Sequence, residues 1–120
     1  MAPELKLGND PVLAPNGIDA TGQMEDEGIE PQQVTDFVVR ITNNSSTPIP
    51  NLTVVVKKKA GSVALNTPSL PIPRLDVGET EELHFQVRNP TNSVQTKYTF
   101  GVQTSYFGSI TNSYKDFVRG

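Results

Sequence analysis

The amino-acid sequence predicts an all-β protein, an antiparallel β-sandwich, and two observations carry this prediction. Apolar residues recur at every second position in several segments, which is the period of a strand with one buried face. Proline, glycine and asparagine gather between these segments, as they do in the turns of antiparallel sheets. Helical periodicity is nearly absent, and a chain of 120 residues suffices for one domain with its own core.

Four segments alternate clearly and form the centre of the predicted sandwich: residues 34–42, 51–57, 81–88 and 97–104. One set of side chains in each segment should face the core, and the other set should face water. The residues expected to face the core are Phe37, Val39, Ile41, Leu52, Val54, Val56, Leu83, Phe85, Val87, Tyr98, Phe100 and Val102.

Weaker segments complete the two sheets. We expect residues 3–8 to open the first sheet, residues 62–66 to form a short edge strand, and residues 109–119 to close the second sheet. The alternation in the last of these changes parity, which predicts a β-bulge near Asn112 or Ser113. The total of about seven strands is typical of an immunoglobulin-like sandwich.

Between the second and third clear segments, two prolines and a turn motif indicate what kind of structure the chain forms. Pro71 and Pro73 each lack an N–H group, so their segment should be an edge strand or a polyproline-like crossover. Asp76 and Gly78 then suit a tight turn, because glycine readily adopts a positive φ angle.

Residues 9–33 are rich in proline, glycine and acidic residues and lack a clear alternation. A connection of this length is unusual in a compact domain. We therefore expect a flexible surface excursion or an arm that becomes ordered against a partner. On this basis residues 1–33 form an N-terminal strand plus an extended arm, and residues 34–120 form the sandwich, within one domain overall.

Charge and composition exclude several classes of function. The net charge is −3 and the pI is near 5.0, which argues against binding to nucleic acid or to anionic lipid. The chain has no cysteine, so disulfides and thiolate metal sites are absent. It contains no apolar run long enough to span a membrane, and its first residues lack the pattern of a secretory signal.

The sequence offers few residues for catalysis. Its one histidine, His84, is placed by the alternation on the outward face of its strand. A dyad with a serine or an aspartate is conceivable, but a histidine that simply faces solvent is the favoured reading. We therefore expect a protein that is not an enzyme and that has no catalytic residues and no cofactor.

An acidic cluster raises the question of calcium. Glu25, Asp26 and Glu27, with Asp19 and Glu30, offer carboxylates, but they lack the spaced ligands and the glycine of a calcium-binding loop. A solvated acidic loop is the favoured interpretation, and we expect no metal site.

The stretch 43–47 contains overlapping Asn-x-Ser/Thr sequons at Asn43 and Asn44, and a third sequon begins at Asn51. Such triplets arise by chance in turns rich in asparagine, serine and threonine. Two prolines follow directly, so we interpret this stretch as the tip of a turn between two strands. Loops at the end of a sandwich are common contact surfaces.

Three stretches together resemble a known family: TNNSSTPIPNLTVVV from Thr42 to Val56, LDVGET from Leu75 to Thr80, and YTFGV from Tyr98 to Val102. They resemble the cell-adhesion-related domain found in bacteria, and they look similar to related immunoglobulin-like modules of surface proteins and phage virions. The resemblance implies an immunoglobulin-like sandwich and a structural or adhesive role. The long segment 9–33 departs from the family pattern, in which the first two strands are linked closely.

Two functions follow as expectations. The first is a non-enzymatic structural or interaction module, an immunoglobulin-like decoration or accessory protein of a large assembly such as a phage virion. The second is an adhesion domain, or a domain that binds carbohydrate or protein, from a secreted bacterial or archaeal surface protein. The second function would use exposed aromatic residues among Tyr106, Phe107 and Tyr114, although two of these three are expected in the core.

Either function places the chain in a virion, outside the cell or at the cell surface. We expect protein partners, including self-association, without nucleic acid and without insertion into a membrane; no motif supports a carbohydrate partner. The candidate partner contacts are Asn43, Asn44, Ser45, Thr47, Tyr106, Phe107, Glu25 and Asp26.

Overall fold

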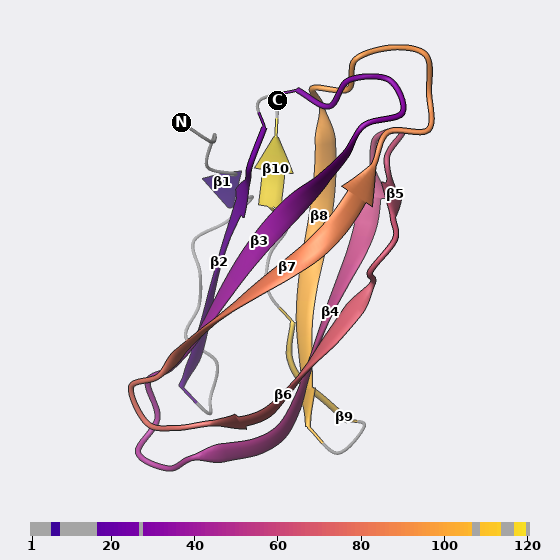
Figure 1. Ribbon diagram of the computed structural model, residues 1–120. Helices are drawn as coiled ribbons and strands as arrows, with labels where there is room; N and C mark the ends of the chain where they lie inside the picture. Colours follow the sequence, from indigo (N-terminus) through magenta and orange to yellow (C-terminus); the bar gives the residue numbers. More distant parts are fainter. Residues whose placement is uncertain (1–5, 8–16, 27, 107–108, 114–116, 120) are drawn as a thin grey trace.

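Two antiparallel β-sheets lie face to face in the computed structural model (Figure 1). The structure describes residues 6–7, 17–26, 28–106, 109–113 and 117–119. Throughout this part of the chain every regular element is a strand, and none of it forms a helix able to cross a membrane. The predicted all-β sandwich is therefore confirmed.

The first sheet has four strands in the order β2-β3-β7-β5. Its centre is the pair β3 and β7, which are in register over nine residue pairs from Val34 opposite Arg88 to Thr42 opposite Thr80. The strands are β2 (Ile18–Met24), β3 (Val34–Asn43), β7 (Thr80–Arg88) and β5 (Ala64–Leu65).

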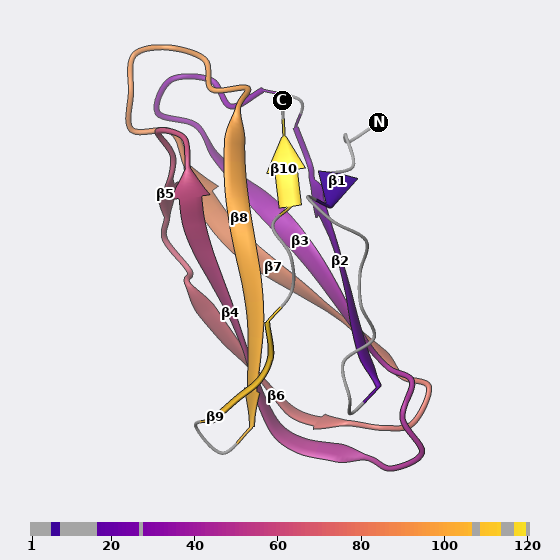
Figure 2. The same cartoon turned by 180° about the vertical axis from the view of Figure 1, so that it is seen from behind.

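The second sheet has six strands in the order β1-β10-β8-β4-β6, with β9 also paired to β8. Figure 2 turns the molecule by 180° and brings β8 and β10 to the front. The strands are β1 (Lys6–Leu7), β10 (Phe117–Arg119), β8 (Tyr98–Tyr106), β4 (Ile49–Ala60), β6 (Ser69–Leu75) and β9 (Ser109–Ser113).

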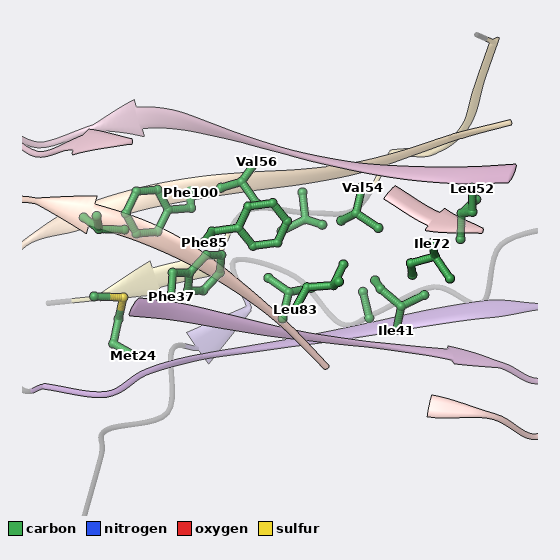
Figure 3. Packing of buried hydrophobic residues seen from close by; sticks show 14 of the residues in the cluster. Met24, Phe37, Ile41, Leu52, Val54, Val56, Ile72, Leu83, Phe85 and Phe100 are labelled. Atoms are coloured by element: carbon green, nitrogen blue, oxygen red, sulfur yellow. The ribbon is translucent and has the colours of Figure 1, made fainter. Parts of the chain in front are cut away.

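The core lies between the two sheets, where the inward residues of the long strands interdigitate (Figure 3). The ring of Phe37 from the first sheet lies 4.9 Å from the ring of Phe100 from the second, measured between centroids. The ring of Tyr98 lies 5.5 Å from that of Phe100. The contact between Phe37 and Phe100 joins the two sheets, whereas the contact between Tyr98 and Phe100 lies within β8. Aliphatic side chains fill the space around these rings.

All four clear segments of the sequence are strands, and every side chain expected in the core is buried. Val38 is buried as well, although the alternation predicts it on the outward face. It lies in a central strand between Gln23 and His84 of the neighbouring strands, and these longer side chains flank it. A central position in a sheet can therefore cover an outward residue.

The prediction for residues 9–33 is wrong in one part, because Ile18–Met24 is not an excursion but the strand β2. It pairs with β3 over seven residues, from Ile18 opposite Asn43 to Met24 opposite Phe37. The inward positions of β2 include Ala20 and Gly22, whose small size hides the alternation of the strand. Residues 9–16 and 27 of the predicted arm lie outside the described residues.

The other weak segments form strands, but one lies in a different sheet than predicted. Residues 6–7 of the segment 3–8 form β1, which pairs with β10 and so belongs to the second sheet, not to the first. Residues 3–5 and 8 of that segment lie outside the described residues. Residues 64–65 form a short strand at the edge of the first sheet, and β6 is an edge strand as its prolines predict. Residues 109–119 hold two strands, not one, and the pairing of β9 with β8 shifts register by the single extra residue Thr111. The irregularity thus falls next to the predicted bulge.

Candidate functional site

Asn43, at the end of β3, organises the loop that follows it. Its side chain is fully buried. Its Nδ2 atom donates to the carbonyl oxygens of Thr47 (2.9 Å) and Leu75 (3.0 Å). Its Oδ1 atom accepts from the backbone N–H (2.9 Å) and the hydroxyl (2.6 Å) of Ser45. One buried amide therefore fixes the whole turn and ties it to β6 of the other sheet.

Asn89, directly after β7, repeats this arrangement. It is also fully buried, and its Nδ2 atom donates to the carbonyl oxygens of Ser93 and Ile29, both at 2.7 Å. Its Oδ1 atom accepts from the backbone N–H (2.9 Å) and the hydroxyl (2.7 Å) of Thr91. Both loops thus follow the pattern Asn-x-Ser/Thr-x-Ser/Thr, and the two asparagines play the same part.

The two loops lie at opposite ends of the first sheet, because β3 and β7 run antiparallel and each asparagine follows the end of its strand. In the loop after β3, Asn44 and Thr47 are exposed and Ser45 is partly buried. The candidate contacts Asn44, Ser45 and Thr47 therefore lie on a braced surface loop. Asn43 lies beneath them, and its fully buried side chain supports the loop instead of facing outward.

The burial of Asn43 also bears on its sequon. The amide nitrogen that would carry a glycan is the buried Nδ2 atom with two carbonyl partners. Asn44 and Asn51, which begin the other sequons, are exposed. The asparagine of the first sequon is therefore a structural residue of the turn.

Glu25 and Asp26, the two acidic residues among the candidate partner contacts, interact with different parts of the first sheet. Asp26 accepts from the hydroxyl of Thr35 (2.5 Å) and from the side-chain amide of Gln33 (3.1 Å), so it braces the connection between β2 and β3. Glu25 lies near His84, with 3.8 Å between Oε1 and Nδ1. These carboxylates diverge and do not form a common pocket.

The remaining carboxylates considered for calcium lie apart from this pair as well. Asp19 accepts from the N–H of the next residue, Ala20, at 2.9 Å. Glu30 lies exposed in a turn that Gln33 closes through a bond to the Glu30 N–H at 2.8 Å. Glu27 and Phe107 lie outside the described residues, as does the side chain of Tyr106.

His84 faces outward from β7, as the alternation predicts, and it contacts carboxylates on both of its ring nitrogens. Nδ1 lies 3.1 Å from Oδ2 of Asp36 on β3, and Nε2 lies 3.4 Å from Oε2 of Glu82 on its own strand. Glu82 in turn binds Arg40 at 2.5 Å. The outer face of the first sheet therefore carries a cluster of alternating charges.

The pKa of His84 is raised above its ordinary value of 6.5. Partial burial acts to lower this pKa, but hydrogen bonds to Asp36 and Glu82, and the negative charges of these carboxylates, outweigh it. Folding therefore favours the protonated imidazole relative to the unfolded chain.

Comparison of the chain with protein-family models and with curated proteins finds no match.

Two kinds of functional residue were not predicted from the sequence alone. Asn89 supports a loop in the same way as Asn43, and the repeated Asn-x-Ser/Thr-x-Ser/Thr pattern at the two strand ends was a signal that could have identified it. Asp36 and Glu82 join His84 through strand register, which the sequence does not state.

Proposed function

We propose that this chain is a non-enzymatic interaction module, an immunoglobulin-like component of a large assembly such as a phage virion. The observation that carries the proposal is the pair of end loops, each fixed by one fully buried asparagine. A loop that is already ordered loses little conformational entropy on binding. Rigid loops at the ends of a sandwich suit permanent contacts with neighbouring proteins.

The loop after β3 is the proposed contact surface. Asn44 and Thr47 are exposed on it, and the bonds of Asn43 hold the backbone between them. Polar side chains on an ordered backbone can form specific hydrogen bonds with a partner, which stabilises a defined orientation. The resemblance of this stretch to immunoglobulin-like modules of surface proteins and virions supports the same role.

Site-specific photo-crosslinking in the source organism tests the proposal. A photoreactive amino acid replaces Asn44 or Thr47, and a control places it at Lys58, which is exposed near the end of β4 that lies farthest from this loop. The proposal expects the two loop positions to crosslink to one defined protein within a fast-sedimenting particle. The control position should give much weaker crosslinks.

Two further outcomes bear on the proposal. If the native chain sediments only as a free monomer and neither loop position crosslinks, the proposal fails. Specific binding to a glycan array that persists after substitution of Asn44 and Thr47 would instead favour a carbohydrate-binding accessory domain.

A further inference from the structure

We propose that Glu25, Asp36 and His84 form a binding site for a divalent transition metal of the zinc class on the outer face of the first sheet. This site is independent of the end loops and goes beyond the proposed role in an assembly. One imidazole nitrogen and two carboxylate oxygens lie within 4.8 Å of one another. Zinc commonly takes three protein ligands of these types and leaves a fourth position for water or another ligand.

The separations between the donor atoms fit such an ion. Nδ1 of His84 lies 3.1 Å from Asp36 Oδ2 and 3.8 Å from Glu25 Oε1. Bonds of about 2.0 Å in a tetrahedron place neighbouring ligand atoms about 3.3 Å apart. Small side-chain rotations therefore suffice to surround one ion, and Nδ1 gives up its proton when the metal binds.

The backbone positions two of these donors on adjacent strands and the third directly after the end of a strand. Asp36 is on β3 and His84 is on β7, and the pairing of these strands fixes the distance between them. Glu25 directly follows β2, and its backbone N–H donates to the carbonyl oxygen of Asp36 at 3.3 Å. Asp36 and His84 thus lie on paired strands, which hold a metal site more precisely than a loop does, and a backbone hydrogen bond holds Glu25 beside them.

The other nitrogen of the imidazole has the partner that a metal-binding histidine needs. Nε2 lies 3.4 Å from Glu82 Oε2, and Glu82 is held by Arg40. Histidine ligands commonly donate the N–H that faces away from the metal to a carboxylate, which fixes the tautomer and the ring orientation. Here that bond leaves Nδ1, on the side of Glu25 and Asp36, as the metal ligand.

The donor set also selects among metals. Calcium prefers six to eight oxygen ligands and magnesium retains most of its waters, so a set of one imidazole and only two carboxylates suits neither ion well. Imidazole with carboxylate suits zinc and its neighbours in the first transition row. Without a metal, the same groups form an ion-pair cluster around a protonated histidine, and the experiment must separate these two roles.

The test is a titration of the full, untagged chain with zinc. Calorimetry measures the affinity and stoichiometry, and NMR monitors the imidazole of His84. His84 is the only histidine, so its ring signals need no further assignment. We expect one zinc ion per chain, with the His84 signals shifting in step with binding. His84→Gln, Asp36→Asn and Glu25→Gln should each weaken binding at least tenfold, and Glu82→Gln by about tenfold or more through the orientation of the ring.

Asp19→Asn is the matched control. It removes one carboxylate from β2 on the same outer face, at the far end of the strand, and it keeps the Oδ1 acceptor for Ala20. Zinc affinity should remain within twofold of the parent chain, and thermal unfolding of each variant confirms that it folds.

Three results would overturn the proposal. The first is no binding at millimolar zinc, and the second is an equal loss of affinity in Asp19→Asn and Asp36→Asn. The third is calcium binding as tight as zinc binding, because it would show that the surface only attracts cations.

Discussion

Asn43 and Asn89 carry more of the local structure than any other polar residues that the structure describes, because each is fully buried and joins a loop to a distant segment. The sequence predicted the loop at Asn43 correctly as a turn between two strands. It did not predict the burial of Asn43, since the same letters describe a solvated turn and a buried amide. The tertiary structure decides between a solvated and a buried side chain, because it brings the carbonyl group of Leu75 to Asn43 and that of Ile29 to Asn89.

Substitution of either buried asparagine should therefore destabilise the fold. We expect Asn43→Ala and Asn89→Ala to lower the free energy of unfolding by about 2–4 kcal/mol each, since each leaves buried donors and acceptors without partners. Chemical denaturation measures the change. The neighbouring exposed residues provide controls: Asn44→Ala and Asn92→Ala should cost less than about 0.5 kcal/mol. Equal losses in all four variants would show that the burial of the amide has no special role.

Protonation of His84 should make stability depend on pH. Its folded pKa lies above the unfolded value of 6.5, so protonation favours the fold. This contribution is complete below the unfolded pKa and is lost as the pH rises through the folded pKa. The charges facing the ring are Glu25, Asp36 and Glu82, with Arg40 beyond Glu82.

Comparison of the parent chain with His84→Gln in a chelating buffer measures this contribution. The difference in free energy of unfolding should shrink as the pH rises from about 5 to about 8, and added salt should reduce it because the groups are half-exposed. A difference that is constant over this range would contradict the expected linkage.

Strands were predictable where one face is uniformly large and apolar, as in β3, β4, β7 and β8. The missed strand, β2, has two of the smallest side chains at inward positions, so its register depends on pairing with β3 and not on its own pattern. The cluster at His84 shows the same limit. The alternation predicts that Asp36, Glu82 and His84 face outward. The alignment of β3 with β7 then decides which of these outward residues become neighbours.

The turns between strands differ in how tightly they are packed, and two glycines make this measurable. Gly61, after β4, has φ +99°, and a Cβ atom there would lie 2.7 Å from Cβ of Tyr98. Gly78, in the turn before β7, has φ +78° with open space around it. We expect Gly78→Ala to cost about 1 kcal/mol for the backbone conformation alone. Gly61→Ala should cost about 3 kcal/mol or more, because the backbone must move as well.

Denaturation curves for the two alanine variants test this difference. Gly78→Ala serves as the matched control, since it changes the same residue type at a similar φ angle. Equal losses of stability would mean that the turn after β4 adapts without strain.

At the scale of the whole molecule, β6 forms one edge of the six-stranded sheet, and this edge is protected against pairing with another chain. Val56 N donates to the Pro68 carbonyl at 2.8 Å, so the even-numbered residues of β6 direct their backbone groups toward β4. The odd-numbered residues direct theirs toward solvent, and two of these are Pro71 and Pro73. The edge therefore lacks two of the N–H groups that a second strand would bind.

Removal of these prolines should promote self-association. We expect the double variant Pro71→Thr with Pro73→Thr to remain folded but to form dimers or larger species, as measured by light scattering at increasing concentration. Pro90→Thr, in an exposed loop away from this edge, should scatter like the parent chain. A double variant that stays as monodisperse as the control would show that other features protect the edge.

The pairing of β1 with β10 has a mechanical consequence. Lys6 lies opposite Val118 and Leu7 opposite Phe117, so the chain enters β1 at the same end of the pair where it leaves β10 (Figure 1). Tension applied before β1 and after β10 would act across the strands and break their hydrogen bonds one after another. It would not shear all of the bonds at once. These two strands would part under low force, while the long pairs β3–β7 and β4–β8 remain intact.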